Sequence, residues 1–200
     1  MSVAQTWMQT ALLVIDMQND FCAPGGWTDT VVKKDISASP AVAVAIAQLL
    51  QRARVAKVPV WWVRADYSPD KVPAPMRARA EKMQAPVCCA PGTWGADWYE
   101  VQPAAGEPVV TKHCYSGFTG TDLDAQLKER GIRALVFSGV QTHVCVESTL
   151  RDAHSRGYFC TVAEDCVASH TPAAHQQTLA NVRLLFGEVA SAAEITKAWG

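Results

Sequence analysis

The feature that most constrains this fold is a series of short apolar runs that alternate with segments of helical patterning. Short runs rich in Val, Ile, Leu and Phe are typical of strands buried on both faces of a parallel sheet. Alternation of strand and helix implies right-handed crossovers, which cover both faces of the sheet with helices. The sequence therefore predicts an α/β fold with a mostly parallel, Rossmann-like sheet of about six strands. The expected strands are Ala11–Asp16, Val58–Val63, Pro108–Lys112, Ala134–Val140 and Tyr158–Ala163, with a short sixth near Ala190.

Four longer helices are expected between these strands. The segment Pro40–Lys57 follows a Ser-x-x-Pro start and stops before Pro59. The segments Thr121–Arg130 and Thr142–Arg156 each end before a glycine. The segment Thr171–Phe186 begins with Thr-Pro, a favoured cap followed by proline at the first helical position.

The chain has 200 residues, which suits a single domain spanning residues 1–200. Segment 68–102 interrupts the alternation of strands and helices. It contains five of the eleven prolines and the stretch PGTWGADWYE. We expect this segment to form a lid or rim over a site rather than a second domain.

Composition argues against nucleic acid or a membrane as a partner. The net charge is −1 and charged residues make up 18% of the chain, so no strong basic patch is expected. The N-terminal MSVAQTWMQT does not resemble a signal peptide, and no run reaches transmembrane length. Seven cysteines, including the adjacent Cys88 and Cys89, do not suit a disulfide framework. We therefore expect a cytoplasmic protein with reduced thiols.

Chemically complementary side chains stand at the ends of three predicted strands. Asp16 ends the first, Lys112 ends the third, and Cys145 follows the fourth at the start of a helix, where backbone N–H groups favour a thiolate. The ligand crevice of such a sheet lies outside the carboxyl ends of its strands, so these groups are expected to converge. The set predicts a hydrolase with a thiol nucleophile, a proton acceptor and a charge partner. Singly, each also suits a structural role, as a buried thiol, a capping carboxylate or a solvated lysine.

Longer motifs resemble the isochorismatase-like cysteine hydrolases. The motifs are DMQNDF, K-x-x-YSGF-x-GTDLD, GV-x-T-x-VCVESTLRDA and EDCVAS, and the match covers about residues 11–189. The resemblance implies a three-layer α/β/α fold with a catalytic triad of Asp16, Lys112 and Cys145. It also implies a cis peptide bond before Gln141 and an oxyanion hole made by the backbone N–H groups of Gln141 and Cys145. Homodimers or homotetramers are suggested by the resemblance alone.

The branch of the family is indicated by PGTWGAD and KHCYSGFTGTDLD, which look most like the enzymes that cleave ureido groups. Those enzymes include ureidoacrylate, biuret or triuret, and N-carbamoyl amine hydrolases. The resemblance thus implies a cysteine-dependent amidohydrolase that cleaves a C–N bond of a small ureido or amide substrate through a thioester, releasing ammonia or amine. A nicotinamidase-like amidase is the alternative. Nicotinamidases of the family carry Asp-x-His plus a further His around a metal, whereas residues 64–68 here read RADYS and lack that histidine. Isochorismatases that cleave a vinyl ether generally lack the cysteine.

Residues near these motifs are candidates for substrate contact, although core packing is an equal alternative for each aromatic one. Gln141 and His143, on the loop of the nucleophile, are the expected specificity positions. Weaker candidates are Gln18, Asn19, His175 and Gln177. The residues expected around the substrate are Phe21, Trp94, Tyr115, Phe118, Gln141 and His143.

Other uses of the cysteines and histidines have less support. No C-x-x-C or H-E-x-x-H motif accompanies His143 and Cys145 or His113 and Cys114, so we expect no metal and no cofactor. A redox role for Cys145 lacks a resolving C-x-x-C partner. A non-catalytic α/β partner domain would be indicated by loss of a triad residue, and all three are present.

Overall fold

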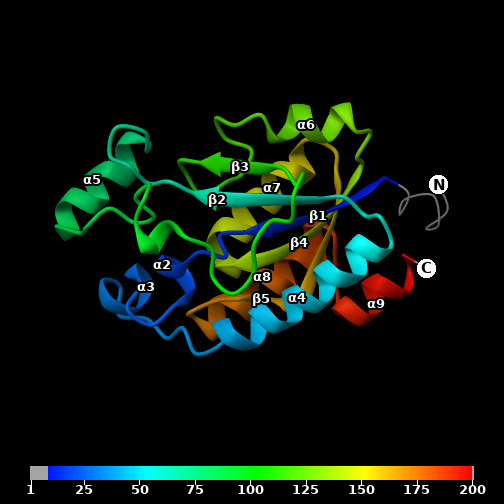
Figure 1. The fold of residues 1–200 in the computed structure, drawn as a ribbon, viewed down its shortest axis with the longest axis horizontal. Helices are drawn as coiled ribbons and strands as arrows, with labels where there is room; N and C mark the ends of the chain where they lie inside the picture. The colour runs from blue at the N-terminus through cyan, green and yellow to red at the C-terminus, as the bar shows by residue number, and fades with distance from the viewer. Residues whose placement is uncertain (1–8, 200) are drawn as a thin grey trace.

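The computed structural model describes residues 9–199, and six strands in that part of the chain form one sheet (Figure 1). Neighbouring strands are all parallel, in the order β3-β2-β1-β4-β5-β6. The predicted α/β fold with a parallel sheet is therefore confirmed. Residues 1–8, where we expect no signal peptide, and residue 200 lie outside the described residues. The strands are β1 (Thr10–Ile15), β2 (Val60–Ala65), β3 (Val109–Lys112), β4 (Ala134–Val140), β5 (Phe159–Ala168) and β6 (Glu188–Ala190).

The register of the strands brings four carboxyl ends to one edge. Ile15, the last residue of β1, pairs with Val63 of β2 and with Gly139 of β4. Ala65, the last residue of β2, pairs with Lys112, the last residue of β3. Residues at or just beyond these ends are therefore neighbours in space, although they are far apart in the sequence.

Different helices cover the two faces of the sheet, which produces three layers. Side chains alternate along a strand, so Leu12 and Val14 of β1 belong to one core while Leu13 and Ile15 belong to the other. All four side chains are fully buried, which is the environment expected for a central strand. Helices α4 (Ser39–Val55) and α9 (Ala192–Lys197) supply the first core, whereas α6 (Leu123–Glu129), α7 (Glu147–Ser155) and α8 (Pro172–Asn181) supply the second.

Two predicted helices contain a wider turn than their sequence pattern suggests. The helix predicted after the fourth strand begins as a π turn, η2 (Thr142–Val146), before it continues as α7. The helix predicted before the sixth strand ends with a second π turn, η3 (Val182–Phe186). In η2 the Val146 amide donates to the Gln141 carbonyl, five residues back, at 3.3 Å. Such turns add one residue to a single helical turn, and in segments this short the shift in the apolar pattern is too small to reveal them.

Strand β5 is longer than the predicted Tyr158–Ala163 and continues to Ala168. Its pairing with β4 shifts between Val162 and Val167, so the intervening residues form an irregularity in the ladder. The polar residues 164–165 lie within this irregularity. A polar interruption predicts an early end to the strand, whereas the backbone bulges and then resumes pairing.

Segment 68–102 lies beyond one end of the sheet and contains α5 (Ala74–Met83) and the short 3₁₀ helix η1 (Trp94–Ala96) (Figure 1). No residue of α5 is buried. Next to η1, Trp98 forms an antiparallel bridge with Gln18, just after β1. A lid or rim function for this segment remains a prediction. Two further short helices, α2 (Asn19–Cys22) and α3 (Trp27–Thr30), lie at the same end of the molecule (Figure 1).

Gly139 is the position where β4 tolerates no side chain. Its φ is +106°, and an added Cβ would overlap the carbonyl oxygen of Ile15 on β1. We expect Gly139→Ala to lower the free energy of unfolding by at least about 2 kcal/mol, because backbone strain and overlap act together. Urea denaturation measures this loss. Gly106→Ala is the matched control, because Gly106 also has a positive φ but has open space around it. The control should lose about 1 kcal/mol from strain alone; equal losses would contradict the role of the overlap.

Candidate active site

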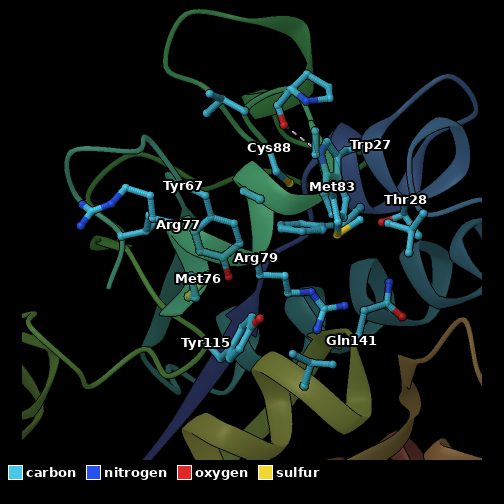
Figure 2. Close-up of a pocket in the computed structure, with 18 of the residues that line it drawn as sticks. Trp27, Thr28, Tyr67, Met76, Arg77, Arg79, Met83, Cys88, Tyr115 and Gln141 are labelled. Carbon is cyan, nitrogen blue, oxygen red and sulfur yellow. Dashed lines mark hydrogen bonds between the residues drawn. The ribbon is translucent and has the colours of Figure 1, made fainter. Parts of the chain in front are cut away.

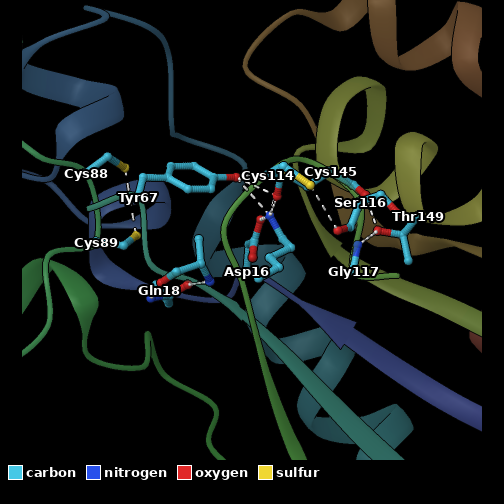
Figure 3. Close-up of polar contacts among 12 residues, drawn as sticks. Asp16, Gln18, Tyr67, Cys88, Cys89, Cys114, Ser116, Gly117, Cys145 and Thr149 are labelled. Carbon is cyan, nitrogen blue, oxygen red and sulfur yellow. Dashed lines mark hydrogen bonds and ion pairs between the residues drawn. The ribbon is translucent and has the colours of Figure 1, made fainter. Parts of the chain in front are cut away.

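Three side chains from three strand ends meet at the carboxyl edge of the sheet. Asp16 follows β1, Lys112 ends β3, and Cys145 lies in η2 after β4 (Figure 3). The Nζ atom of Lys112 is 2.9 Å from Oδ2 of Asp16 and 3.4 Å from Sγ of Cys145. Asp16 and Lys112 are completely buried and Cys145 is almost so. The structure thus brings the predicted carboxylate, ammonium and thiol into contact.

Lys112 has further acceptors around its ammonium group. It donates to the Tyr67 hydroxyl at 2.9 Å and to the Cys114 carbonyl at 3.0 Å. The same Tyr67 hydroxyl lies 3.7 Å from Sγ of Cys145. A buried charge without partners is very costly, so these contacts hold the ammonium between Asp16 and Cys145.

Burial controls the protonation of the three groups. It raises the pKa of Asp16 above its usual value, although the positive charge of Lys112 opposes the shift. Burial and the negative charge of Asp16 raise the pKa of Cys145 to about 12. Burial alone would lower the pKa of Lys112, but the charges of Asp16 and Cys145 raise it instead. At neutral pH the resting thiol is therefore protonated. This differs from the thiolate expected at a helix start, because desolvation outweighs the backbone dipoles.

The backbone between β4 and Cys145 is tightly constrained. The Val140–Gln141 peptide bond is cis, as the resemblance implies. The Gln141 carbonyl accepts the Val146 amide across the π turn, and the Gln141 side chain accepts the His170 amide at 2.8 Å. Both the main chain and the side chain of Gln141 are thus fixed. The role of the Gln141 and Cys145 N–H groups as an oxyanion hole remains a prediction.

Cys145 lines a cavity of about 730 Å³ (Figure 2). This volume suits a small-molecule ligand. Helix α5 and the residues that follow it supply one wall, while the loops after β1, β2, β3, β4 and β5 supply the others. Four of the predicted contact residues line the cavity: Phe21, Tyr115, Gln141 and His143.

The sequence matches the isochorismatase domain over residues 10–194. This chain belongs to the isochorismatase family. It is 39% identical to ureidoacrylate amidohydrolase RutB from Methylorubrum extorquens, over 92% of this chain and 80% of that protein. Its structure is similar to that of a cysteine hydrolase from Pseudomonas syringae pv. phaseolicola, with a TM-score of 0.84 and 28% identity, covering 96% of this chain and 92% of the other. It also resembles N-carbamoylsarcosine amidase from Thermoplasma acidophilum, with a TM-score of 0.75 and 28% identity over 92% and 97% of the two chains.

Two of the predicted contact residues do not line the cavity of this family member. Phe118 is buried in the core, where its ring lies 5.9 Å from that of Tyr158. Trp94 is half exposed on η1, and its carbonyl accepts the side chain of Asn19. The structure therefore does not place these two aromatics on the wall of this cavity. Phe118 lies within the motif that begins at Lys112, but its side chain packs in the second core, beside α6 and α7.

The weaker candidates have mainly structural contacts. Gln18 is fully buried, and its side chain bonds the backbone of Ala65 at both N and O. The side chain of Asn19 donates a hydrogen bond to the carbonyl of Trp94 at 2.8 Å. His175 bonds the hydroxyl of Thr142 at 2.9 Å, which supports the turn that carries the nucleophile. Gln177 is exposed and bonds Asn181 on its own helix.

Several cavity residues have no counterpart in the sequence-based predictions. Tyr67 follows β2 at the same edge as the triad, so the strand-end rule could have identified it. Helix α5 carries no apolar periodicity that would indicate which of its residues face a cavity. Met76, Arg79 and Met83 of α5 were missed for this reason, and Trp27 and His170, on other elements, were not predicted either.

One group of side chains has the composition of a metal site. Ligand atoms of Asp20, Cys88 and Cys89 lie within 4.8 Å of one another. The Asp20 carboxylate already accepts the amides of Cys89 and Trp27, at 2.6 and 3.1 Å. Asp66, in the segment where nicotinamidases carry metal ligands, forms an ion pair with Lys71 at 2.7 Å. Both carboxylates thus have partners from the protein itself.

The cause of the raised pKa of Cys145 is directly testable. Asp16→Asn removes a negative charge that raises this pKa, while Lys112, which lowers it, remains. We expect the pKa of the Cys145 thiol to fall by at least about one unit. The pH dependence of alkylation, followed by mass spectrometry of the peptide that contains Cys145, measures the change. Glu147→Gln, on the neighbouring turn, is the control and should leave the thiol pKa unchanged. An unchanged or higher pKa in Asp16→Asn would contradict the assigned cause.

Proposed function

We propose that this chain is a cysteine-dependent amidohydrolase that cleaves a C–N bond of a small ureido substrate through a thioester. The observation that supports this most directly is the contact of Asp16 and Lys112 with Cys145, whose side chain lines a cavity of small-molecule size. A nucleophile, a proton acceptor and a fixed positive charge are the groups that acyl transfer needs.

The first step is proton transfer within the triad. Asp16 takes the proton of the Cys145 thiol, so the negative charge moves from carboxylate to sulfur. The Nζ atom of Lys112 contacts both the carboxylate oxygen of Asp16 and the sulfur of Cys145. Lys112 therefore keeps an ion pair whether the negative charge is on the oxygen or on the sulfur. The net charge of the buried cluster does not change, which avoids the cost of creating a new buried charge. The raised pKa of Asp16 makes this carboxylate a stronger base than an exposed one.

The second step is attack of the thiolate on the ureido carbonyl carbon. The carbonyl oxygen becomes an oxyanion, which the backbone N–H groups of Gln141 and Cys145 would stabilise by about 3–4 kcal/mol per donor. The C–N bond then breaks, and Asp16 returns its proton to the departing ammonia or amine. Sulfur now carries a carbamoyl group, so the thioester is an S-carbamoyl cysteine. Water attacks its carbonyl while Asp16 accepts a proton, the C–S bond breaks, and Cys145 takes that proton to become the thiol as the carbamate leaves.

The ureido class of substrate is supported by the relatives. One is named a ureidoacrylate amidohydrolase and a similar structure is an N-carbamoylsarcosine amidase. A nicotinamidase-like amidase is less well supported, because Asp66 is engaged by Lys71 and by the Ser68 hydroxyl at 2.7 and 2.6 Å. We therefore favour a linear ureido compound over a pyridine amide.

Cys145→Ala tests the proposed function. We expect ammonia release from ureidoacrylate, biuret or N-carbamoyl amino acids to fall at least about 1,000-fold, because the covalent route is lost. A coupled ammonia assay measures turnover, and nicotinamide completes the panel. Cys114→Ala is the matched control, because it removes a nearby thiol while keeping the backbone carbonyl that binds Lys112. Activity that survives in Cys145→Ala, or its absence from the unmodified protein on every substrate, would refute the proposal.

The assembly and the compartment are expectations that rest on the resemblance and the composition. No helix in residues 9–199 is long and apolar enough to cross a membrane. We propose a cytoplasmic homodimer or homotetramer that acts on its substrate without nucleic acid or membrane as a partner. Light scattering coupled to size-exclusion chromatography should give two or four times the mass of one chain, and the mass of a single chain would contradict this prediction.

A further inference from the structure

The wall of the active-site cavity carries an excess of positive charge. Three cationic residues line it, Lys34, Arg77 and Arg79, against one acidic residue outside the triad, Glu81. None of the three cations forms an ion pair with a carboxylate among residues 9–199. Residues 1–8 contain no Asp or Glu. The cavity therefore presents positive charge that its own side chains do not neutralise.

The two histidines of the cavity do not alter this balance. Burial lowers the pKa of His143 and of His170, so both are neutral near pH 7. They offer hydrogen bonds instead, and each already has a hydroxyl partner: His143 contacts Ser169 at 2.7 Å and His170 contacts Thr171 at 2.9 Å. The positive charge of the cavity wall is therefore carried by Lys34, Arg77 and Arg79.

The two arginines of α5 are arranged differently. Arg79 extends into the cavity toward Gln141 and Tyr115, whereas Arg77 points away from them (Figure 2). Arg77 also donates to the carbonyl of Pro69 at 3.3 Å. Arg79 is therefore the guanidinium that faces the loop of the nucleophile.

We propose that Arg79 binds a carboxylate at the end of the substrate remote from the scissile ureido group. This rests on the proposed function and narrows its substrate class to anionic ureido compounds rather than neutral ones such as biuret. The planar guanidinium matches a carboxylate with two parallel hydrogen bonds. Trp27, Met76 and Met83 line the same cavity and suit a short apolar linker between the two ends of the substrate.

The role of Arg79 follows from its charge, so the test compares two ligands that differ in charge. The pair is 3-ureidopropionate and butylurea, in which an ethyl group replaces the carboxylate. Binding to the Cys145→Ala protein is measured by calorimetry and turnover by ammonia release from the enzyme with Cys145 intact. Arg79→Gln should weaken binding of 3-ureidopropionate about 10- to 100-fold. It should change binding of butylurea by no more than about twofold.

Two further variants complete the experiment. Lys82→Gln removes the same charge from the same helix, but Lys82 does not line the cavity, so the ligand preference should be kept. Arg79→Lys keeps the positive charge but lacks the planar guanidinium that makes two parallel hydrogen bonds. It should therefore bind 3-ureidopropionate more tightly than Arg79→Gln does, but less tightly than the unmodified residue. Equal losses for both ligands in Arg79→Gln, or no preference for 3-ureidopropionate in the presence of Arg79, would overturn the inference. Binding that depends on Arg79 without turnover of either ligand would support the anion site while counting against the proposed function.

Discussion

The buried ammonium group of Lys112 is the interaction on which the site depends. A lysine that is completely removed from solvent must be surrounded by acceptors, and here these come from Asp16, Tyr67, Cys114 and Cys145. Those residues follow or belong to different strand ends, so the ammonium can be satisfied only when the sheet has its full register. Folding and assembly of the triad are therefore the same event.

The same ion pair determines how reactive the thiol is. Burial raises the pKa of both Asp16 and Cys145, and Lys112 acts against both shifts. The cluster carries one negative charge that can reside on oxygen or on sulfur while the cation stays in place. Moving the negative charge between the Asp16 carboxylate and the Cys145 sulfur, with the ammonium of Lys112 held in contact with both, needs little reorganisation of the surroundings. Low reorganisation favours catalysis in an enclosed site.

Sequence reasoning located the sheet and the triad but only part of the cavity. The strands and the strand ends follow from apolar runs, so Asp16, Lys112 and Cys145 could be placed together in advance. Phe118 and Trp94 do not line the cavity, because an aromatic residue near a motif suits a core or a surface as well as a wall. Arg79 was missed because no residue of α5 is buried, and the sequence of this helix does not indicate which side faces a cavity. The wide turn that carries Cys145 is too short for its shift in the apolar pattern to be recognised, so the sequence does not reveal it either.

The raised pKa of Cys145 also bears on the durability of the protein. Thiolates, rather than thiols, are oxidised to sulfenic, sulfinic and sulfonic acids, and the last of these cannot be reduced again. Burial and the raised pKa keep the Cys145 sulfur as a thiol, so peroxide is expected to oxidise it slowly. The burial that disfavours the Cys145 thiolate would therefore also slow the loss of this thiol to irreversible oxidation.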